Sequence, residues 1–234
     1  MKTSAELIVE AKKNAALEAV KHVKDNFIIG LGSGTTVAFA IEALGKRIKE
    51  ENLQIMGIPS SHQAFQLAVQ HGIQITTLDE HPVIDITIDG ADQVTPELYL
   101  IKGMGAALLR EKIVATASKY NIVIVDKSKR VNTLGENNQA VPIEVLPFAL
   151  SLVEKKIASL GGNAIVREGK GKLGPIITDN GNIITDVNFG LIQNPQELSV
   201  KVKSIPGVVE TGFFVGLTDL VYIATESKIE KLQK

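Results

Sequence analysis

Residues 30–36, Gly-Leu-Gly-Ser-Gly-Thr-Thr, are the first stretch of this sequence whose residue types could bind a ligand. They fall between a predicted strand and a predicted helix. Glycines let the backbone approach a ligand closely, and the N–H groups at a helix N-terminus favour an anion. The hydroxyl groups of Ser33, Thr35 and Thr36 add further donors. The segment predicts a phosphate site, with a tight strand-to-helix turn capped by Thr35 or Thr36 as the alternative.

The same segment departs from the dinucleotide-binding fingerprint Gly-x-Gly-x-x-Gly. Thr35 stands where that fingerprint has its third glycine, and the next predicted strand ends in Ile58-Pro59-Ser60, without an acidic residue. An acidic residue there would bind the ribose of a nicotinamide cofactor. A dinucleotide is therefore the weaker interpretation, and we expect no cofactor.

Two carboxylates three residues apart, Asp89 and Asp92, lie at the carboxyl end of another predicted strand. Ligands of open parallel sheets bind at that end of the strands. Only Gly90 and Ala91 separate the two carboxylates, so both can converge on one small polar ligand. The alternative is a turn in which the Asp side chains cap backbone N–H groups, and the residues alone do not decide between the two.

A second glycine-flanked loop, residues 102–105, runs into a predicted helix at 106–117. Lys102 brings a positive charge to a turn rich in N–H donors, and this combination can stabilise an oxyanion. Glu111 falls on the first or second turn of the helix, where a Glu is ordinarily an exposed residue favoured by the helix dipole. Its position alone does not mark it as catalytic.

Three cations, Lys127, Lys129 and Arg130, follow the predicted strand at 122–125. Their place just past the end of a strand would allow them to complete a phosphate site. A solvated loop is an equally good interpretation of the same residues.

The spacing of apolar residues predicts the elements that must position these side chains. Short apolar runs, which read as buried strands, alternate with helical patterns and lie at residues 27–31, 55–58, 73–77, 83–88 and 122–125. This alternation predicts an α/β fold in which helices cover both faces of a parallel sheet.

The pattern changes after about residue 131. Strand, helix, two strands, helix and strand follow one another, and residues 179–182, Asp-Asn-Gly-Asn, give a strong hairpin signal. The order βαββαβ predicts a ferredoxin-like α+β domain inserted at residues 132–214. Residues 1–131 plus 215–234 would form the larger catalytic domain, with residues 220–224 returning to the first sheet as a strand.

The composition argues against several classes of function. Lys plus Arg number 25 against 26 Asp plus Glu, and a net charge of -1 does not favour a nucleic-acid partner. The chain has no cysteine, and its four histidines lack metal-ligand spacing, so we expect no metal. No apolar run approaches the about 20 residues that span a bilayer, and the N-terminus lacks an apolar signal core. We expect a cytoplasmic protein without a membrane partner.

Taken together and in this order, the motifs resemble the ribose-5-phosphate isomerase A family over essentially the whole chain. The resembling segments are GLGSGTT at 30–36, DGAD at 89–92, KGMGAALLREK at 102–112, DKSK at 126–129, VPIEVLP at 141–147, TDNGN at 178–182 and IPGVVETGFF at 205–214. The family usually has glycine where Met104 stands. Its fold, a Rossmann-like sheet flanked by helices with an inserted ferredoxin-like domain, agrees with the elements predicted above.

The resemblance implies an aldose-ketose isomerase that interconverts D-ribose 5-phosphate and D-ribulose 5-phosphate through an enediolate, in the non-oxidative pentose phosphate pathway. It makes Glu111 the base that transfers the proton, with Asp89 and Lys102 as further catalytic residues. The implied substrate-binding residues are Ser33, Gly34, Thr35, Thr36, Asp89, Gly90, Ala91, Asp92, Lys102, Gly103, Met104, Gly105 and Lys129. It also implies a small-molecule sugar phosphate as the partner, no cofactor, and a homodimer or homotetramer.

Three other functions are alternatives to this one. A non-catalytic sugar-phosphate sensor of the repressor type would carry a DNA-binding domain ahead of the sheet, whereas here the sheet pattern begins by Phe27. Acyl-CoA transfer on a related fold would need a nucleophilic carboxylate in a differently organised site. A nicotinamide-dependent oxidoreductase is the third.

Overall fold

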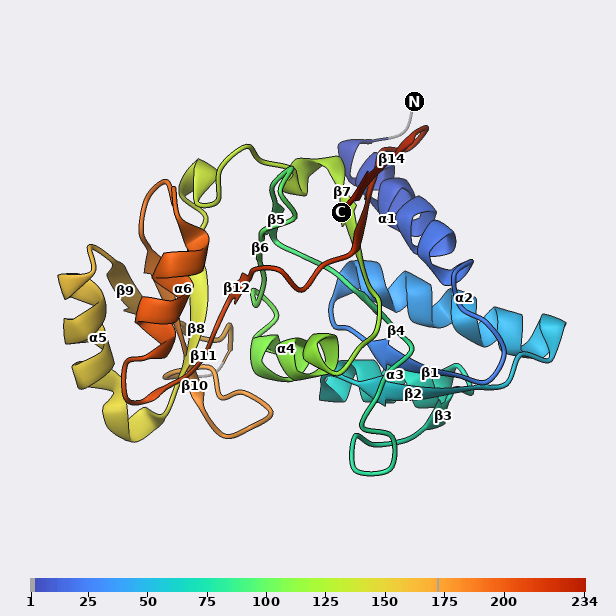
Figure 1. Cartoon of the computed structure of the whole chain (residues 1–234), viewed down its shortest axis with the longest axis horizontal. Helices are drawn as coiled ribbons and strands as arrows, with labels where there is room; N and C mark the ends of the chain where they lie inside the picture. Colours follow the sequence, from blue (N-terminus) through green and yellow to red (C-terminus); the bar gives the residue numbers. More distant parts are fainter. Residues whose placement is uncertain (1–2, 172) are drawn as a thin grey trace. The chain divides into compact units, whose positions relative to one another are not determined.

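The computed structural model describes residues 3–171 and 173–234, which form two compact units (Figure 1). The first unit comprises Met1–Ala91, Arg110–Arg130 and Leu217–Lys234, and the second comprises Asp92–Leu109 and Val131–Gly216. The predicted domains differ from these units chiefly in residues 92–109, which pack with the second unit. The domain boundaries themselves stay a prediction.

A mostly parallel sheet forms the centre of the first unit. Its strands, in spatial order, are β14 (Ile229–Gln233), β13 (Leu220–Ala224), β7 (Asn121–Asp126), β4 (Ile86–Asp89), β1 (Phe27–Leu31), β2 (Ile55–Pro59) and β3 (Gln74–Ile75). The edge strand β14 runs antiparallel to β13, and the other pairings are parallel. This order confirms the predicted Rossmann-like sheet and the return of residues 220–224 to it.

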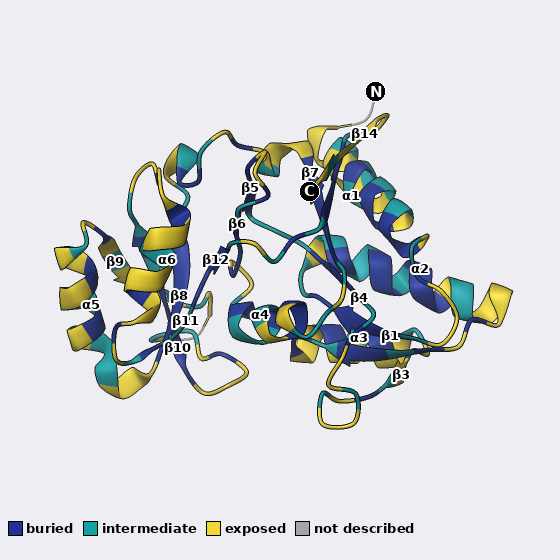
Figure 2. Ribbon diagram, in the orientation of Figure 1, coloured by how far each residue is buried: buried dark blue, intermediate teal, exposed yellow. Residues whose placement is uncertain are grey.

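Helices cover both faces of this sheet. Successive residues of a strand point to opposite faces, and both sets are apolar here, so each face needs a helical layer to bury it. Ile29 of β1 packs into the core that α1 (Ser4–Val20) and α2 (Thr35–Glu51) share with α3 (His62–Gln70). Its neighbour Ile28 packs instead against Val114 of α4 (Leu108–Thr116). Strands β1, β4 and β7 are accordingly buried along most of their length (Figure 2).

The first helix shows how local sequence and packing agree. Thr3 and Glu6 form a capping box, in which the Glu6 N–H donates to the Thr3 hydroxyl and the Thr3 N–H donates to the Glu6 carboxylate. Ala11, Ala15 and Ala19 recur every four residues and are buried. Their small side chains let α1 pack closely on the sheet and on α2.

An antiparallel sheet with two helices forms the main part of the second unit. Its elements, in chain order, are β8 (Val141–Val145), α5 (Leu150–Ser159), β9 (Asn163–Val166), β10 (Ile183–Asn188), α6 (Pro195–Lys203) and β11 (Val208–Thr211). The spatial strand order is β11-β8-β10-β9, and both helices contribute to one core. A βαββαβ unit with the fourth strand beside the first is the ferredoxin-like arrangement that the sequence predicted.

A small three-stranded sheet explains why residues 92–109 belong to the second unit. Strand β6 (Leu100–Ile101) pairs on one side with β5 (Gln93–Val94) and on the other with β12 (Phe213–Phe214). The helix–strand alternation gave no signal for this pairing, because each of these strands contains only two residues.

A buried carboxylate holds the predicted hairpin of the second unit in place. Glu144 of β8 is fully buried, and its Oε1 accepts hydrogen bonds from Thr178 Oγ1 (2.9 Å), Asn180 Nδ2 (3.1 Å) and Asn182 Nδ2 (2.8 Å). The hairpin closes through the Thr178 N–H to Asn182 carbonyl bond of 2.8 Å. On the N-terminal side of the hairpin, where residues 176–178 suggested a strand, the structure has one isolated bridge, between Ile177 and Ile183. Glu144 thus joins two of the family-like segments, at 141–147 and 178–182.

Replacing this carboxylate should destabilise the protein strongly. Glu144→Ala leaves three hydrogen-bond donors without their acceptor, and we expect the free energy of unfolding to fall by about 3 kcal/mol. Glu144→Gln keeps one acceptor oxygen, so its free energy of unfolding should lie between those of the wild type and Glu144→Ala. Urea unfolding followed by circular dichroism measures both.

The matched control is Glu154→Ala on α5, in the same unit. Glu154 is only half-buried, so its loss should change the free energy of unfolding by less than about 0.5 kcal/mol. Equal stabilities for the Glu144→Ala and Glu154→Ala variants would show that the Glu144 network does not anchor the hairpin.

Candidate active site

The first unit offers a binding position where its strand order changes direction. From β1 the chain proceeds outward through β2 and β3, whereas β4, β7 and β13 lie on the other side of β1. The carboxyl ends of β1 and β4 therefore lie at the point of changed direction, which is where α/β sheets bind their ligands. Gly32 directly follows β1, and Asp89 is the last residue of β4.

Asp89 and Gly32 meet at this position. Asp89 is 5% exposed, and its Oδ1 accepts hydrogen bonds from the Ser33 N–H (3.2 Å) and the Gly90 N–H (2.7 Å). A Cβ on Gly32 would lie 2.1 Å from that same oxygen, so this position requires glycine. The carboxylate therefore makes the backbone-capping contacts of the alternative interpretation while standing at the ligand-binding edge.

A cluster of hydroxyl groups lies beside this contact, and sequence reasoning missed most of it. Ser33 Oγ is 2.9 Å from Ser60 Oγ and 2.7 Å from Ser61 Oγ, and the Gly34 N–H donates to Gln63 Oε1 at 3.0 Å. Ser60 and Ser61 follow β2, which pairs with β1, so their strand ends meet at one edge. The sequence signal for them was that Ser60 and Ser61 directly follow the strand predicted at residues 55–58.

The N-terminus of α2 differs from the predicted hydroxyl cap. Gly34 is the N-cap residue, at φ 101°, and no side chain caps the helix there. Thr35 and Thr36 are its first helical residues, and Thr35 Oγ1 accepts a hydrogen bond from Lys12 Nζ at 2.9 Å. The prediction of Thr35 or Thr36 as the cap was wrong, because glycine alone readily adopts the backbone angle of this turn. The helix N-terminus favours an anion at this point.

Of the three predicted cations, Lys129 is the one best placed for the same edge of the sheet. It ends a short 3-10 helix, η1 (Lys127–Lys129), which follows β7 and is capped by Asp126. Strand β7 lies next to β4, so Lys129 is near the carboxyl end of the strand adjacent to that of Asp89. Arg130 instead pairs with Glu230, at 2.6 Å between Nη1 and Oε1, and Lys127 is exposed.

Glu111 is buried, contrary to what its helix position suggested. It is 5% exposed although it stands in the first turn of α4. Three residues on, Val114 lies on the same face of the helix and packs closely on β1, because a Cβ on Gly30 would lie 2.5 Å from its Cγ1. Glu111 is therefore on the sheet-facing side of α4, and only the packing of the helix reveals this.

The remaining predicted residues form a group in the second unit. Lys102 follows β6 and is 3% exposed; its Nζ lies 5.1 Å from the centre of the Phe214 ring, a cation–π contact. Its N–H donates to the Gly212 carbonyl at 2.9 Å. Asp92 Oδ2 accepts a hydrogen bond from the Met104 N–H at 3.0 Å. Lys102 and Asp92 are thus both tied to this unit's own framework.

The loop accommodates Met104 in place of the family's usual glycine. Gly103 is the loop residue with the left-handed angle, φ 109°, and a Cβ there would lie 2.7 Å from Leu108. The φ of Met104 is negative, and its side chain is 49% exposed. Methionine therefore neither strains the backbone nor fills the loop, and Gly105 beyond it has open space.

Several predicted residues stand beside the first two of the four points at which the chain passes from one unit to the other. The chain leaves the first unit after Ala91 and re-enters it at Arg110. Gly90 and Ala91, both half-buried, stand before the first of these points, and Asp92 stands directly after it. Glu111 stands just after the second.

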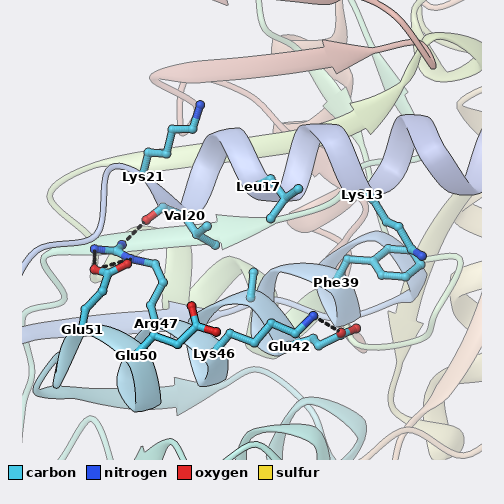
Figure 3. A pocket seen from close by; sticks show the side chains of 11 residues that line it. Lys13, Leu17, Val20, Lys21, Phe39, Glu42, Lys46, Arg47, Glu50 and Glu51 are labelled. Carbon is cyan, nitrogen blue, oxygen red and sulfur yellow. Dashed lines mark hydrogen bonds and ion pairs between the residues drawn. The ribbon is translucent and has the colours of Figure 1, made fainter.

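A groove elsewhere in the first unit does not involve these residues. It lies between α1 and α2, has a volume of about 720 Å³, and is lined by Lys13, Leu17, Val20, Lys21, Phe39, Glu42, Ala43, Lys46, Arg47, Glu50 and Glu51 (Figure 3). Lys46 pairs with Glu42 at 2.7 Å, and Arg47 with Glu51 at 2.8 Å. Because two of its cations are already paired with carboxylates, this groove has little preference for a phosphate.

Two kinds of feature are absent from the part of the chain that the structure describes. It contains no group of three or more His, Cys, Asp or Glu residues placed to hold a metal ion. Within the same residues, no helix combines the length and apolar character needed to cross a membrane.

The fold and the first-unit residues together define an α/β protein whose strand ends carry a helix N-terminus and buried carboxylates. The model of the family ribose 5-phosphate isomerase A (phosphoriboisomerase A) matches residues 56–228. The chain belongs to this family and is an isomerase.

Relatives and solved structures match nearly the whole chain. Ribose-5-phosphate isomerase A of Methanothermobacter thermautotrophicus is 45% identical over 97% of this chain and 100% of its own length. The structure of the Methanocaldococcus jannaschii enzyme superposes with a TM-score of 0.91 at 46% identity, covering 95% of this chain and 98% of that one. A D-ribose-5-phosphate isomerase in complex with phospho-erythronic acid gives a TM-score of 0.94 at 42% identity, covering 97% and 99%.

The contact between Gly32 and Asp89 can be tested by a substitution that adds a single methyl group. In Gly32→Ala the new Cβ overlaps the Asp89 carboxylate, so either the carboxylate or the turn must move. We expect the free energy of unfolding to fall by about 1–3 kcal/mol and isomerase activity to fall with it. Thermal unfolding and an isomerase assay provide the measurements.

Gly90→Ala is the stability control for this substitution. A Cβ on Gly90 would meet its nearest atom, the Ile124 carbonyl oxygen, at 3.9 Å, which is ordinary contact. Its unfolding free energy should stay within about 0.5 kcal/mol of wild type. If Gly32→Ala were as stable as Gly90→Ala, the tight Gly32–Asp89 contact would be absent in solution.

Proposed function

We propose that this isomerase interconverts D-ribose 5-phosphate and D-ribulose 5-phosphate through a cis-enediolate, with one carboxylate carrying the proton. The observation that carries the proposal is the burial of Glu111, 5% exposed on the sheet-facing side of α4, in a chain of this family. A titratable group held away from water by packing is suited to proton transfer. The bound phospho-erythronic acid of a relative supports a phosphorylated sugar as substrate.

Glu111 is the proposed base in both directions. It removes the proton from C2 of the open-chain aldose, and the electron pair left at C2 forms the enediolate with the former carbonyl oxygen. It then returns the proton to C1, while a second proton moves from O2 to O1 and the carbonyl forms at C2. Asp89, held by the Ser33 and Gly90 N–H groups, is assigned to ring opening and to this transfer between oxygens.

The charge that develops on the substrate oxygens needs a positive partner, and Lys102 is assigned to it. Lys102 is 3% exposed, and a charge shielded from water stabilises a nearby anion more strongly than an exposed one. Lys129 and the N-terminus of α2, with Thr35 and Thr36, are assigned to the phosphate group. Asp92 and the loop of residues 103–105 are assigned to the sugar hydroxyls and the reacting oxygens.

Substituting the proposed base should abolish chemistry while sparing binding. Glu111→Gln keeps the size and polarity of the side chain but cannot accept the proton. We expect kcat for ribose 5-phosphate to fall by a factor of about 10²–10⁴, with KM changed only a few-fold. Incorporation of solvent deuterium into the sugar, followed by NMR, should fall in parallel.

Glu50→Gln makes the same chemical change in the α1–α2 groove and should retain wild-type kcat. Near wild-type turnover and deuterium incorporation by Glu111→Gln would assign the base to another residue. Loss of activity in the Glu50→Gln variant would instead indicate that the α1–α2 groove takes part in the reaction.

The proposed mechanism needs no metal ion. The chain has no cysteine, and the described residues lack a cluster of metal-ligand type, whereas the carboxylates and lysines supply the chemistry. We expect kcat to be unchanged after dialysis against EDTA. A loss of activity that added Zn²⁺ restored would contradict the mechanism.

Three further proposals rest on the family resemblance. We place the enzyme in the cytoplasm and in the non-oxidative pentose phosphate pathway, and we propose a homodimer or homotetramer. Sedimentation equilibrium would measure the oligomeric state directly.

A further inference from the structure

Arg167 is a largely buried cation of the second unit to which neither the motifs nor the proposed mechanism assigns a role. It directly follows β9, and its side chain is 10% exposed. Its N–H donates to the Ile184 carbonyl at 2.8 Å, and its own carbonyl accepts from the Ile176 N–H at 2.8 Å. The backbone of Arg167 is therefore fixed on both sides, and its side chain starts from a defined position.

The guanidinium group connects a carboxylate to the loop that follows Lys102. Nε donates to Asp186 Oδ2 at 2.7 Å, and Nη2 pairs with Asp186 Oδ1. Nη1 donates to two successive loop carbonyls, those of Gly103 (3.0 Å) and Met104 (2.9 Å). Asp186 holds one edge of the planar fork, so the fork can hold the loop in one orientation.

A carboxylate holds the same loop through its N–H side. The Met104 N–H donates to Asp92 Oδ2, while the Gly103 carbonyl of that same peptide group accepts from Arg167. This peptide plane is thus held at both ends, by groups of opposite charge. Left-handed backbone angles at Gly103 (φ 109°) and Ala106 (φ 60°) flank Met104 and Gly105, and the angle at Ala106 is unusual for alanine.

Fixing the next peptide group determines the direction of one particular donor. In a trans peptide the N–H points away from the carbonyl, so holding the Met104 carbonyl on Arg167 turns the Gly105 N–H to the opposite side. Gly105 is exposed, and its N–H donates no hydrogen bond within the described residues. A backbone donor is therefore left for a ligand, three residues after the buried Lys102.

We propose that Arg167 is a positioning residue for the isomerisation. With Asp186 and Asp92 it fixes the peptide groups of residues 103–105, so that the Gly105 N–H is presented to the oxyanion that Lys102 neutralises. The inference rests on the proposed function, because it supposes that this loop serves the enediolate. A donor of fixed direction favours the transition state over the ground state, since it needs no reorientation as charge develops.

Arg167→Lys is the central test. Lysine keeps the positive charge but cannot bind Asp186 with two nitrogens and also hold two carbonyls. We expect kcat for ribose 5-phosphate to fall by a factor of about 10² with KM changed less than about 3-fold, because misdirecting one oxyanion donor affects mainly the transition state. Asp186→Asn, which leaves Arg167 in place but weakens its anchor, should lower kcat by a smaller factor.

A second readout distinguishes positioning from general destabilisation. The affinity for 4-phospho-D-erythronic acid, whose carboxylate carries the kind of charge that the enediolate carries, is measured by calorimetry. It should weaken in Arg167→Lys in parallel with the loss of kcat, while the far-UV circular dichroism and the urea midpoint report the folded fraction.

Arg47→Lys is the matched control. Arg47 also combines a two-nitrogen contact to a carboxylate, that of Glu51, with hydrogen bonds to two carbonyls, those of Val20 and Val23, but it lies on α2 away from the loop. The control should lose stability without losing kcat per folded molecule or affinity for the sugar acid.

Two results would overturn the inference. The first is that Arg167→Lys keeps the kcat and the sugar-acid affinity of the wild type. The second is that its kcat falls only in proportion to the fraction of molecules that are unfolded, as expected for Arg47→Lys. Failure of the wild-type enzyme to convert ribose 5-phosphate would contradict the proposed function instead. The calorimetric comparison of wild type with Arg167→Lys would still decide the role of Arg167 in that case.

Discussion

The first unit depends on the close approach of the Asp89 carboxylate to the backbone at Gly32. A carboxylate buried at the end of β4 needs hydrogen-bond donors, and the turn after β1 supplies the Ser33 N–H. Only glycine leaves room for that contact. This turn also determines where α2 begins, and it brings Ser33 Oγ into hydrogen-bond contact with the Ser60 and Ser61 hydroxyl groups after β2. Capping a turn and binding a ligand are compatible roles for Asp89, because one of its oxygens makes the backbone contacts at the edge of the sheet where α/β proteins bind ligands.

Both units bury carboxylates, but in different surroundings. One oxygen of Glu144 accepts hydrogen bonds from three side chains and so ties a hairpin to an inner strand of its sheet. Glu111 lies on a helix face that packs on the sheet, and we propose it as the base of the isomerisation. In the second unit, Arg167 donates hydrogen bonds to two carbonyls of the loop, and Asp92 accepts one from a loop N–H. Rigid charged contacts of this kind orient a loop that carries few apolar side chains of its own.

Much of the architecture could be predicted because it depends on local pattern. Buried apolar runs alternating with amphipathic helices indicated the parallel sheet, and the βαββαβ order indicated the ferredoxin-like part. The pairing of β5 and β6 with β12 was missed, since two-residue strands have no periodicity to detect. Helix capping at Thr35 or Thr36 was also predicted wrongly, because a glycine with a positive φ supplied the turn that a hydroxyl cap would otherwise have made.

By itself, the sequence determined which residue types are available for chemistry: a glycine- and hydroxyl-rich turn, paired aspartates, a lysine before a glycine loop, and no cysteine. These follow from composition and spacing along the chain, and so does the family resemblance. Only the tertiary structure decided which side chains lose contact with water and which groups they contact. Glu111, Ser60 and Arg167 look like ordinary surface residues in the sequence, because burial and hydrogen-bond partners come from segments far apart in the chain. Their environment is a property of packing between elements, which no local pattern records.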